Sequence, residues 1–204
     1  MGHMEICLLF LYNKERGESM KDKKSTARSV VIYIIELLAI IVASQLVFTK
    51  VIRPVSIIGS SMYPTVADQD IALINVIGLK ESELKRFDVV IIDWKQNNEN
   101  IIKRLIGFPG DHIKFVNDEL YINGVLYEED YLDRDYVARA KASRGVSQFT
   151  ADFEYIVPEG QYFVLGDNRL NSADSRTIGC FSFNDFIGKE GVVIYPFNHF
   201  NWIK

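Results

Sequence analysis

A sharp turn after an apolar run places two serines where a hydroxyl could act as a nucleophile. The stretch GSSMYPT, residues 59–65, combines Gly59, which permits unusual backbone dihedrals, with Pro64, which restricts the exit. A serine at such a strand end presents its hydroxyl beside a backbone N–H, and acyl transfer needs both groups. The stretch does not match the G-x-S-x-G nucleophile pattern, and serines before a proline are also ordinary turn residues.

A lysine inside the apolar segment 101–106, IIKRLI, is the second group that could do chemistry. If the segment is a strand, Lys103 shares a face with Ile101 and Leu105. A lysine among apolar side chains has a lowered pKa, because its charged form loses hydration, and the neutral amine can then deprotonate a serine. Arg104 also has apolar neighbours on its face. The alternation of a strand therefore does not show whether Lys103 or Arg104 is the buried side chain, and we expect at least one of the two to reach water.

The segment LGDNRLNSADSRTIG, residues 165–179, is dense in short polar side chains. Such a composition predicts a loop that hydrogen-bonds its own backbone and supports a neighbouring site, although a solvated loop has a similar composition. Ion pairs are expected either between Asp174 and Arg176 or between Asp167 and Arg169.

Other chemistries have little support. The two cysteines, Cys7 and Cys180, and the three histidines lack metal-binding spacing, so we expect no metal and no cofactor. His112 and His199 have no companion motif that would make either one the base of a triad. The net charge of -4 provides no general basic field for nucleic acid.

These residues must be positioned by two kinds of element, of which the first is the apolar segment 29–49. It holds one charge, Glu36, in 21 residues, and as a helix it would be roughly 31 Å long, enough to cross a bilayer. A buried core helix is the alternative. Basic residues crowd residues 14–28, and few follow the segment. We therefore expect 1–28 to be cytoplasmic, 29–49 to be an uncleaved transmembrane helix and 50–204 to be extracytoplasmic. The opening MGHM resembles a tag remnant.

Residues 50–204 are predicted to form a mainly β catalytic domain with bent antiparallel sheets. Short β-branched and aromatic runs separated by turn residues predict strands at 70–77, 87–94, 101–106, 112–116, 119–122, 161–165 and 191–195. Asn123-Gly124 predicts a tight hairpin, and Ser182 caps a short helix. Residues 128–151 are polar and are interpreted as an irregular excursion or small cap on this β domain.

Taken together and in order, the motifs resemble those of the bacterial type I signal peptidases, Gram-positive type. GSSMYPT matches Gly-x-Ser-Met-x-Pro-Thr, KRLIGFPGD matches Lys-Arg-x-x-Gly-x-Pro-Gly-Asp, and GDNRLNSADSR matches Gly-Asp-Asn-Arg-x-x-Ser-x-Asp-Ser-Arg. The resemblance runs from the apolar segment to near the C-terminus. It implies a largely antiparallel β fold after one membrane span, and a serine endopeptidase without a metal or cofactor.

The resemblance assigns roles by position. Ser61 becomes the nucleophile and Lys103 the general base, and Ser172 would orient the lysine amine. Asp174 and Arg176 match a supporting ion pair. The other dyad-supporting positions are Gly59, Met62, Arg104 and Asp167. Gly59 stands where some members have a serine that helps to bind the oxyanion, Phe87 where a glycine is common, and Leu170 where a polar residue is usual.

The implied activity is the removal of signal peptides from exported preproteins, after small-x-small motifs, by an enzyme in the cell membrane. The substrate is expected to lie as an extended strand between SIIG and NIIK, in shallow apolar pockets lined by Ile57, Ile58, Ile101 and Ile102. The expected partners are the preproteins, the lipid bilayer and the protein-translocation machinery, and no nucleic acid.

Two alternatives remain at this point. A self-cleaving protease resembling the SOS repressors also uses a Ser-Lys dyad on a related β fold, but the apolar segment argues against it. A non-catalytic, membrane-anchored assembly factor for pili or surface proteins would lack the dyad residues, both of which are present here.

Overall fold

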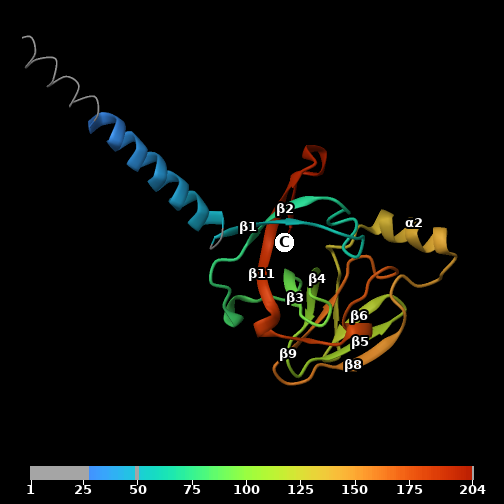
Figure 1. Ribbon diagram of the computed structural model, residues 1–204. Helices are drawn as coiled ribbons and strands as arrows, with labels where there is room; N and C mark the ends of the chain where they lie inside the picture. Colours follow the sequence, from blue (N-terminus) through green and yellow to red (C-terminus); the bar gives the residue numbers. More distant parts are fainter. Residues whose placement is uncertain (1–27, 49–50, 204) are drawn as a thin grey trace, which may run out of the picture. The chain divides into compact units, whose positions relative to one another are not determined.

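The computed structural model describes residues 28–48 and 51–203, and the chain divides into two compact units, Met1–Val47 and Phe48–Lys204 (Figure 1). The predicted cytoplasmic segment 1–28 lies outside the described residues except for Arg28. Each unit is described by itself.

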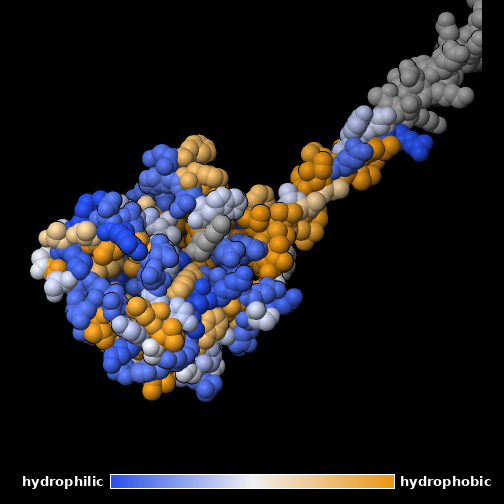
Figure 2. All heavy atoms as spheres, turned by 180° about the vertical axis from the view of Figure 1, so that it is seen from behind, coloured by the Kyte–Doolittle hydropathy of each residue, from blue (hydrophilic) through white to orange (hydrophobic). Residues whose placement is uncertain are grey.

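The described part of the first unit is helical, and its helix, Arg28–Phe48, is long and apolar enough to cross a membrane. Its bounds agree with the predicted span 29–49 to within a residue. Figure 2 shows its surface as mostly hydrophobic, and its large apolar side chains are exposed along its whole length. None of its most apolar window is buried, whereas the core helix of a soluble protein is mostly buried.

The second unit is mainly β, as predicted, and its larger sheet has eight antiparallel strands. Along the sheet the order is β1 (Ile52–Ser56), β2 (Ile71–Asn75), β11 (Phe186–Tyr195), β3 (Val89–Trp94), β4 (Glu99–Gly107), β9 (Gln161–Leu165) and β10 (Phe181–Ser182), and β12 (Asn201–Ile203) also pairs with β11. Irregular register in β11 and β4 bends this sheet. One of its buried apolar clusters includes Ile57, Met62 and Ile102.

A smaller antiparallel sheet follows β4 in the chain. Its order is β7 (Val125–Tyr127), β6 (Glu119–Ile122), β5 (His112–Val116) and β8 (Phe153–Ile156). The turn between β6 and β7 is the predicted hairpin, because Asn123 and Gly124 both adopt positive φ, 53° and 80°. All seven predicted strands occur, with bounds shifted by a few residues.

Short helices complete the unit. They are η1 (Glu81–Glu83), α2 (Arg134–Arg144), α3 (Ser175–Ile178), η2 (Phe183–Asp185) and η3 (Phe197–His199). η2 is the predicted short helix, and Ser182 bonds the Asp185 carboxylate at its start.

The excursion 128–151 is more regular than predicted, because it contains α2. The Asp133 carboxylate caps the helix by accepting a hydrogen bond from the Tyr136 N–H, and Gly145 ends it in the left-handed region. None of its residues is fully buried, so no apolar stripe marks it in the sequence. The only indications of this helix in the sequence were its capping residues and the three alanines between Tyr136 and Ser143.

Candidate active site

The loop between β1 and β2 carries Ser61. It is closed at its base by two backbone hydrogen bonds, Ile57 N to Asp70 O (2.8 Å) and Gln69 N to Ile57 O (2.9 Å). Gly59 has a φ of 91°, which favours glycine, and its N–H donates to Asp68 Oδ1 at 2.7 Å. The backbone therefore turns sharply just before Ser61, as the sequence predicted.

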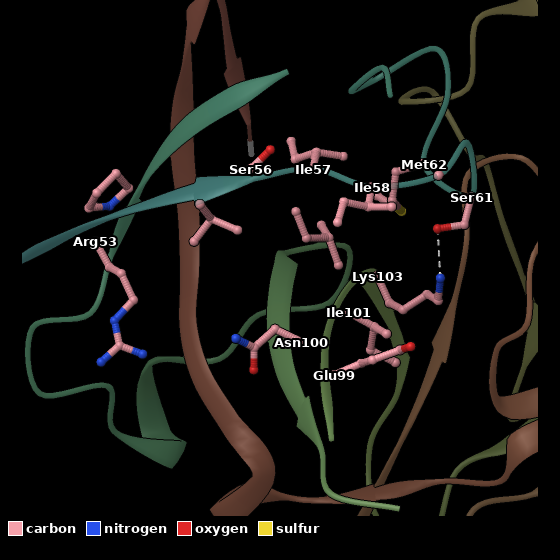
Figure 3. A pocket seen from close by; sticks show the side chains of 14 residues that line it. Arg53, Ser56, Ile57, Ile58, Ser61, Met62, Glu99, Asn100, Ile101 and Lys103 are labelled. Atoms are coloured by element: carbon pink, nitrogen blue, oxygen red, sulfur yellow. Dashed lines mark hydrogen bonds between the residues drawn. The ribbon is translucent and has the colours of Figure 1, made fainter. Parts of the chain in front are cut away.

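Lys103 reaches this loop from β4, as the dashed line in Figure 3 shows. Its Nζ donates a hydrogen bond to Ser61 Oγ at 2.7 Å, and the lysine is only 3% exposed. Burial lowers the pKa of Lys103 to about 8, against the opposing effect of the Asp174 and Asp167 charges; the Arg176 charge lowers it further. An amine with this pKa is partly neutral near physiological pH and can accept a proton.

The loop between β9 and α3 supports the lysine. Asp174 forms the predicted ion pair with Arg176, whose Nε and Nη2 lie 2.8 and 2.9 Å from its two carboxylate oxygens. Burial would raise the pKa of Asp174, but the hydrogen bonds and charge of Arg176 and the Gly166 N–H keep that pKa below its usual value. Asp174 therefore stays ionised close to Lys103.

Ser172 lies in the same loop, where Gly166 allows very close packing. A Cβ on Gly166 would collide with Ser172 Oγ and with the Ser61 carbonyl oxygen. Among buried side-chain N and O atoms of the described residues, Ser172 Oγ alone has no hydrogen-bond partner. The predicted hydrogen bond from Ser172 to the lysine amine is therefore not formed in this structure.

Arg104 and Lys103 are both buried, so the expectation that at least one of them reaches water was wrong. The Arg104 guanidinium donates to both oxygens of the buried Asp167 at 2.7 and 2.8 Å, and it lies over the Tyr131 ring at 4.1 Å. A buried charge is tolerated when it is paired and hydrogen-bonded in this way. Alternation along the strand could not reveal that both side chains are buried, because a different segment of the chain covers each face of β4.

Of the two alternative ion pairs predicted from the sequence, Asp174–Arg176 forms and Asp167–Arg169 does not. Asp167 pairs with Arg104, and Arg169 pairs with Glu129 at 2.5 Å. Arg169 is buried and also contacts Tyr131 and Thr150. Sequence reasoning did not identify Glu129 and Arg169 as a pair that holds the excursion 128–151 against the polar loop.

Two further positions are explained by local geometry. Met62 is buried, and its sulfur accepts a hydrogen bond from the Asp167 N–H at 3.4 Å, which links the serine loop to the polar loop. Phe87 has a φ of 73°, in the left-handed region that favours glycine. The ring packs against Tyr127 and Tyr131, so that a bulky residue occupies this unusual backbone position.

A cleft of about 530 Å³ runs from Ser61 and Lys103 between two strand segments. All four predicted substrate-pocket residues line it, including Ile102, and Figure 3 shows Ile57 and Ile58 on one side and Ile101 on the other. β4 pairs with β9 only from Arg104 onward, and β1 pairs only with β2. Residues 99–103 and β1 therefore present unpaired strand edges to the cleft.

The described residues hold no group of three or more side chains that could bind a metal. His112 Nε2 lies 2.6 Å from Glu154 and His199 Nδ1 lies 2.8 Å from Asp70, whereas Ser61 Oγ is hydrogen-bonded to Lys103.

Comparison with known proteins places this geometry in a family. A family model described as "Signal peptidase, peptidase S26" matches residues 28–195. The chain is 44% identical over 187 residues to signal peptidase I U of Bacillus subtilis (strain 168), covering 91% of this chain and 97% of that protein.

Two further proteins are similar to this chain. Signal peptidase I of Streptococcus pneumoniae is 34% identical, over 78% of this chain and 89% of that protein. A solved signal peptidase I from Enterococcus faecalis V583 is 40% identical, with a TM-score of 0.44, over 52% of this chain and 96% of the solved one. The family-model match and the identity across most of the chain show that this protein belongs to the signal peptidase family, peptidase S26, as a peptidase of the signal peptidase I type.

Proposed function

We propose that this protein is a membrane-anchored serine endopeptidase that removes signal peptides from exported preproteins with Ser61 as nucleophile and Lys103 as general base. The observation that carries the proposal is the 2.7 Å contact between Lys103 Nζ and Ser61 Oγ at the end of a cleft, with the pKa of the lysine lowered to about 8. A neutral amine at hydrogen-bond distance from a hydroxyl has the geometry of a base and its nucleophile.

The reaction then proceeds in two halves. Neutral Lys103 takes the Ser61 proton as Oγ attacks the scissile carbonyl carbon, and the resulting ammonium returns that proton to the departing amine. This leaves an acyl-enzyme and the free N-terminus of the mature protein. A water deprotonated by the same amine attacks the ester, and the lysine returns the proton to Ser61 Oγ.

The oxyanion that forms during the reaction needs hydrogen-bond donors that are not already bonded to other groups. Gly59 has no hydroxyl, and its N–H is already bonded to Asp68. We therefore assign the Ser61 backbone N–H as the main donor. Gly59, Met62, Ser172, Asp174, Arg176, Arg104 and Asp167 hold the two reacting side chains, as the contacts above support.

The cleft suits an extended peptide. Its two walls offer unpaired backbone groups, which can form sheet-like hydrogen bonds with a substrate strand, and the isoleucines between them leave shallow apolar pockets. Shallow pockets accept small side chains, which is the basis for cleavage after small-x-small motifs. The exposed apolar helix Arg28–Phe48 would anchor this cleft at the membrane, with the N-terminus cytoplasmic and the cleft outside, where precursors emerge from the translocation machinery.

The test uses the full chain in detergent with a preprotein, followed by mass determination of the products. Ser61→Ala and Lys103→Met should each abolish cleavage and leave the circular dichroism spectrum unchanged, because each removes one reacting group. Ser60→Ala, which changes the neighbouring serine, should retain most of the activity. Turnover by Ser61→Ala or Lys103→Met would end the dyad assignment, and an inactive wild-type chain would favour the assembly-factor alternative.

A further inference from the structure

The C-terminal turn contacts the base of the serine loop through a histidine that the proposed chemistry does not use. His199, in η3, points its Nδ1 at Asp70 Oδ1 over 2.8 Å, across 129 residues of sequence. Asp70 is only 2% exposed, whereas the His199 side chain is 45% exposed. A carboxylate this deeply buried requires hydrogen bonds to both of its oxygens.

Asp70 in turn holds the loop that carries Ser61. Its second oxygen, Oδ2, accepts a hydrogen bond from the Ala67 N–H at 2.8 Å, and its backbone carbonyl accepts one from the Ile57 N–H at 2.8 Å. The residue therefore joins both ends of the loop, and Ile57 also lines the cleft. Ser61 lies between these two attachments, and its carbonyl also accepts a hydrogen bond from the Asn168 N–H at 3.0 Å, so Asp70 is one anchor of the backbone that carries the nucleophile.

The backbone around His199 is fixed without help from its side chain. β11 and β12, on either side of the turn, pair with each other from Gly191–Ile203 to Val193–Asn201, and the His199 N–H donates to Pro196 O at 2.9 Å. β11 also pairs with β2, which starts directly after Asp70. Changing the imidazole alone should therefore leave the turn folded and remove one specific hydrogen bond.

We propose that His199 is a positioning residue for the nucleophile: its imidazole holds the Asp70 carboxylate, and Asp70 sets the loop geometry that places Ser61 Oγ against Lys103 Nζ. The inference rests on the proposed function. A displacement of well under 1 Å matters for such a pair, since misplacement of reacting groups by about 1 Å can cost on the order of a hundredfold in rate.

The experiment compares His199→Ala with His199→Asn in the full chain in detergent, measuring kcat and KM for preprotein cleavage and the rate of Ser61 acylation by a serine-reactive penem. His199→Ala should lower kcat and the acylation rate on the order of tenfold or more. His199→Asn places an amide N–H near the position of Nδ1 and should restore both rates to within a few-fold of wild type. His112→Ala is the matched control, because it removes another histidine–carboxylate contact, to Glu154 on the smaller sheet, and should change neither rate.

The outcomes separate the two proposals. Wild-type rates in His199→Ala, or equal losses in the alanine and asparagine variants, overturn the positioning role. If the wild-type chain is acylated at Ser61 but cuts no preprotein, the proposed function fails, and the acylation rates still decide the role of His199. A wild-type chain that is neither acylated nor active overturns both.

Discussion

At the scale of single residues, the protein places a lysine where its charged form is disfavoured. Lowering the pKa of Lys103 from 10.5 to about 8 corresponds to about 3 kcal/mol of preference for the neutral amine. Asp174 and Asp167 limit this shift, because their charges favour the ammonium. The resulting pKa leaves a useful fraction of neutral base near neutral pH and still allows the ammonium to donate a proton to the leaving amine.

This balance predicts the pH dependence of cleavage. Lys103 acts as a base only when neutral, so kcat/KM should rise with pH up to about 8 and then level off, falling about tenfold per unit well below that value. The measurement is kcat/KM between pH 6 and 9 with a peptide substrate that has no titrating group in this range. A flat profile across the range would contradict a lysine base.

At the scale of elements, the two halves of strand β4 have different roles. From Arg104 onward it pairs with β9 and contributes buried core, whereas residues 99–103 have a free edge that lines the cleft. β1 presents the facing edge. Between them Ile58 is 92% exposed beside Ser61, and such exposure of a large apolar side chain next to a reactive group indicates a contact surface for the substrate.

Ile58→Ala should therefore act on substrate binding and not on folding. We expect KM to rise several-fold, kcat to change little, and the free energy of unfolding to stay within about 0.5 kcal/mol of wild type, because the side chain buries almost nothing. Ile156→Ala is the matched control, since Ile156 is 70% exposed on the smaller sheet, away from the cleft residues. An unchanged KM in Ile58→Ala would remove this residue from the substrate surface.

At the scale of the whole molecule, the chain combines an apolar helix with a β unit that has its own core. By the positive-inside rule, the basic residues of 14–28 predict a cytoplasmic N-terminus. A cleft on the opposite side of the membrane would then meet precursors as they emerge. The orientation is thus essential to the proposed substrate class.

Labelling with a membrane-impermeant maleimide tests this orientation. In a chain with Cys7→Ser and Cys180→Ser, the variant Asn97→Cys, at an exposed position, should react in intact spheroplasts if residues 50–204 lie outside as proposed. A cysteine at Lys14 should react only after the membrane is permeabilised. The reverse pattern would place the cleft in the cytoplasm and contradict the proposed processing of exported proteins.

The sequence by itself determined the apolar span and the strand-rich unit. These depend on local properties: the length of an apolar run, strand alternation, and the residue types that a turn requires. Ser61 and Lys103 were paired only through the resemblance of the three motifs to those of the signal peptidases, because strand alternation left Lys103 and Arg104 equally open. Helix α2 was missed, although its caps were visible, because no apolar stripe accompanied them.

Only the tertiary structure decided what covers each side chain. Alternation assigned Lys103 and Arg104 to opposite faces of a strand but could not show that both faces are buried, or that Asp167, 63 residues away in sequence, neutralises Arg104. Only the folded structure showed which ion pairs form, that the Ser172 hydroxyl has no hydrogen-bond partner, and that His199 contacts Asp70. The energy of a charged or polar group depends on its partners and its hydration, and distant segments supply both only once the chain has folded.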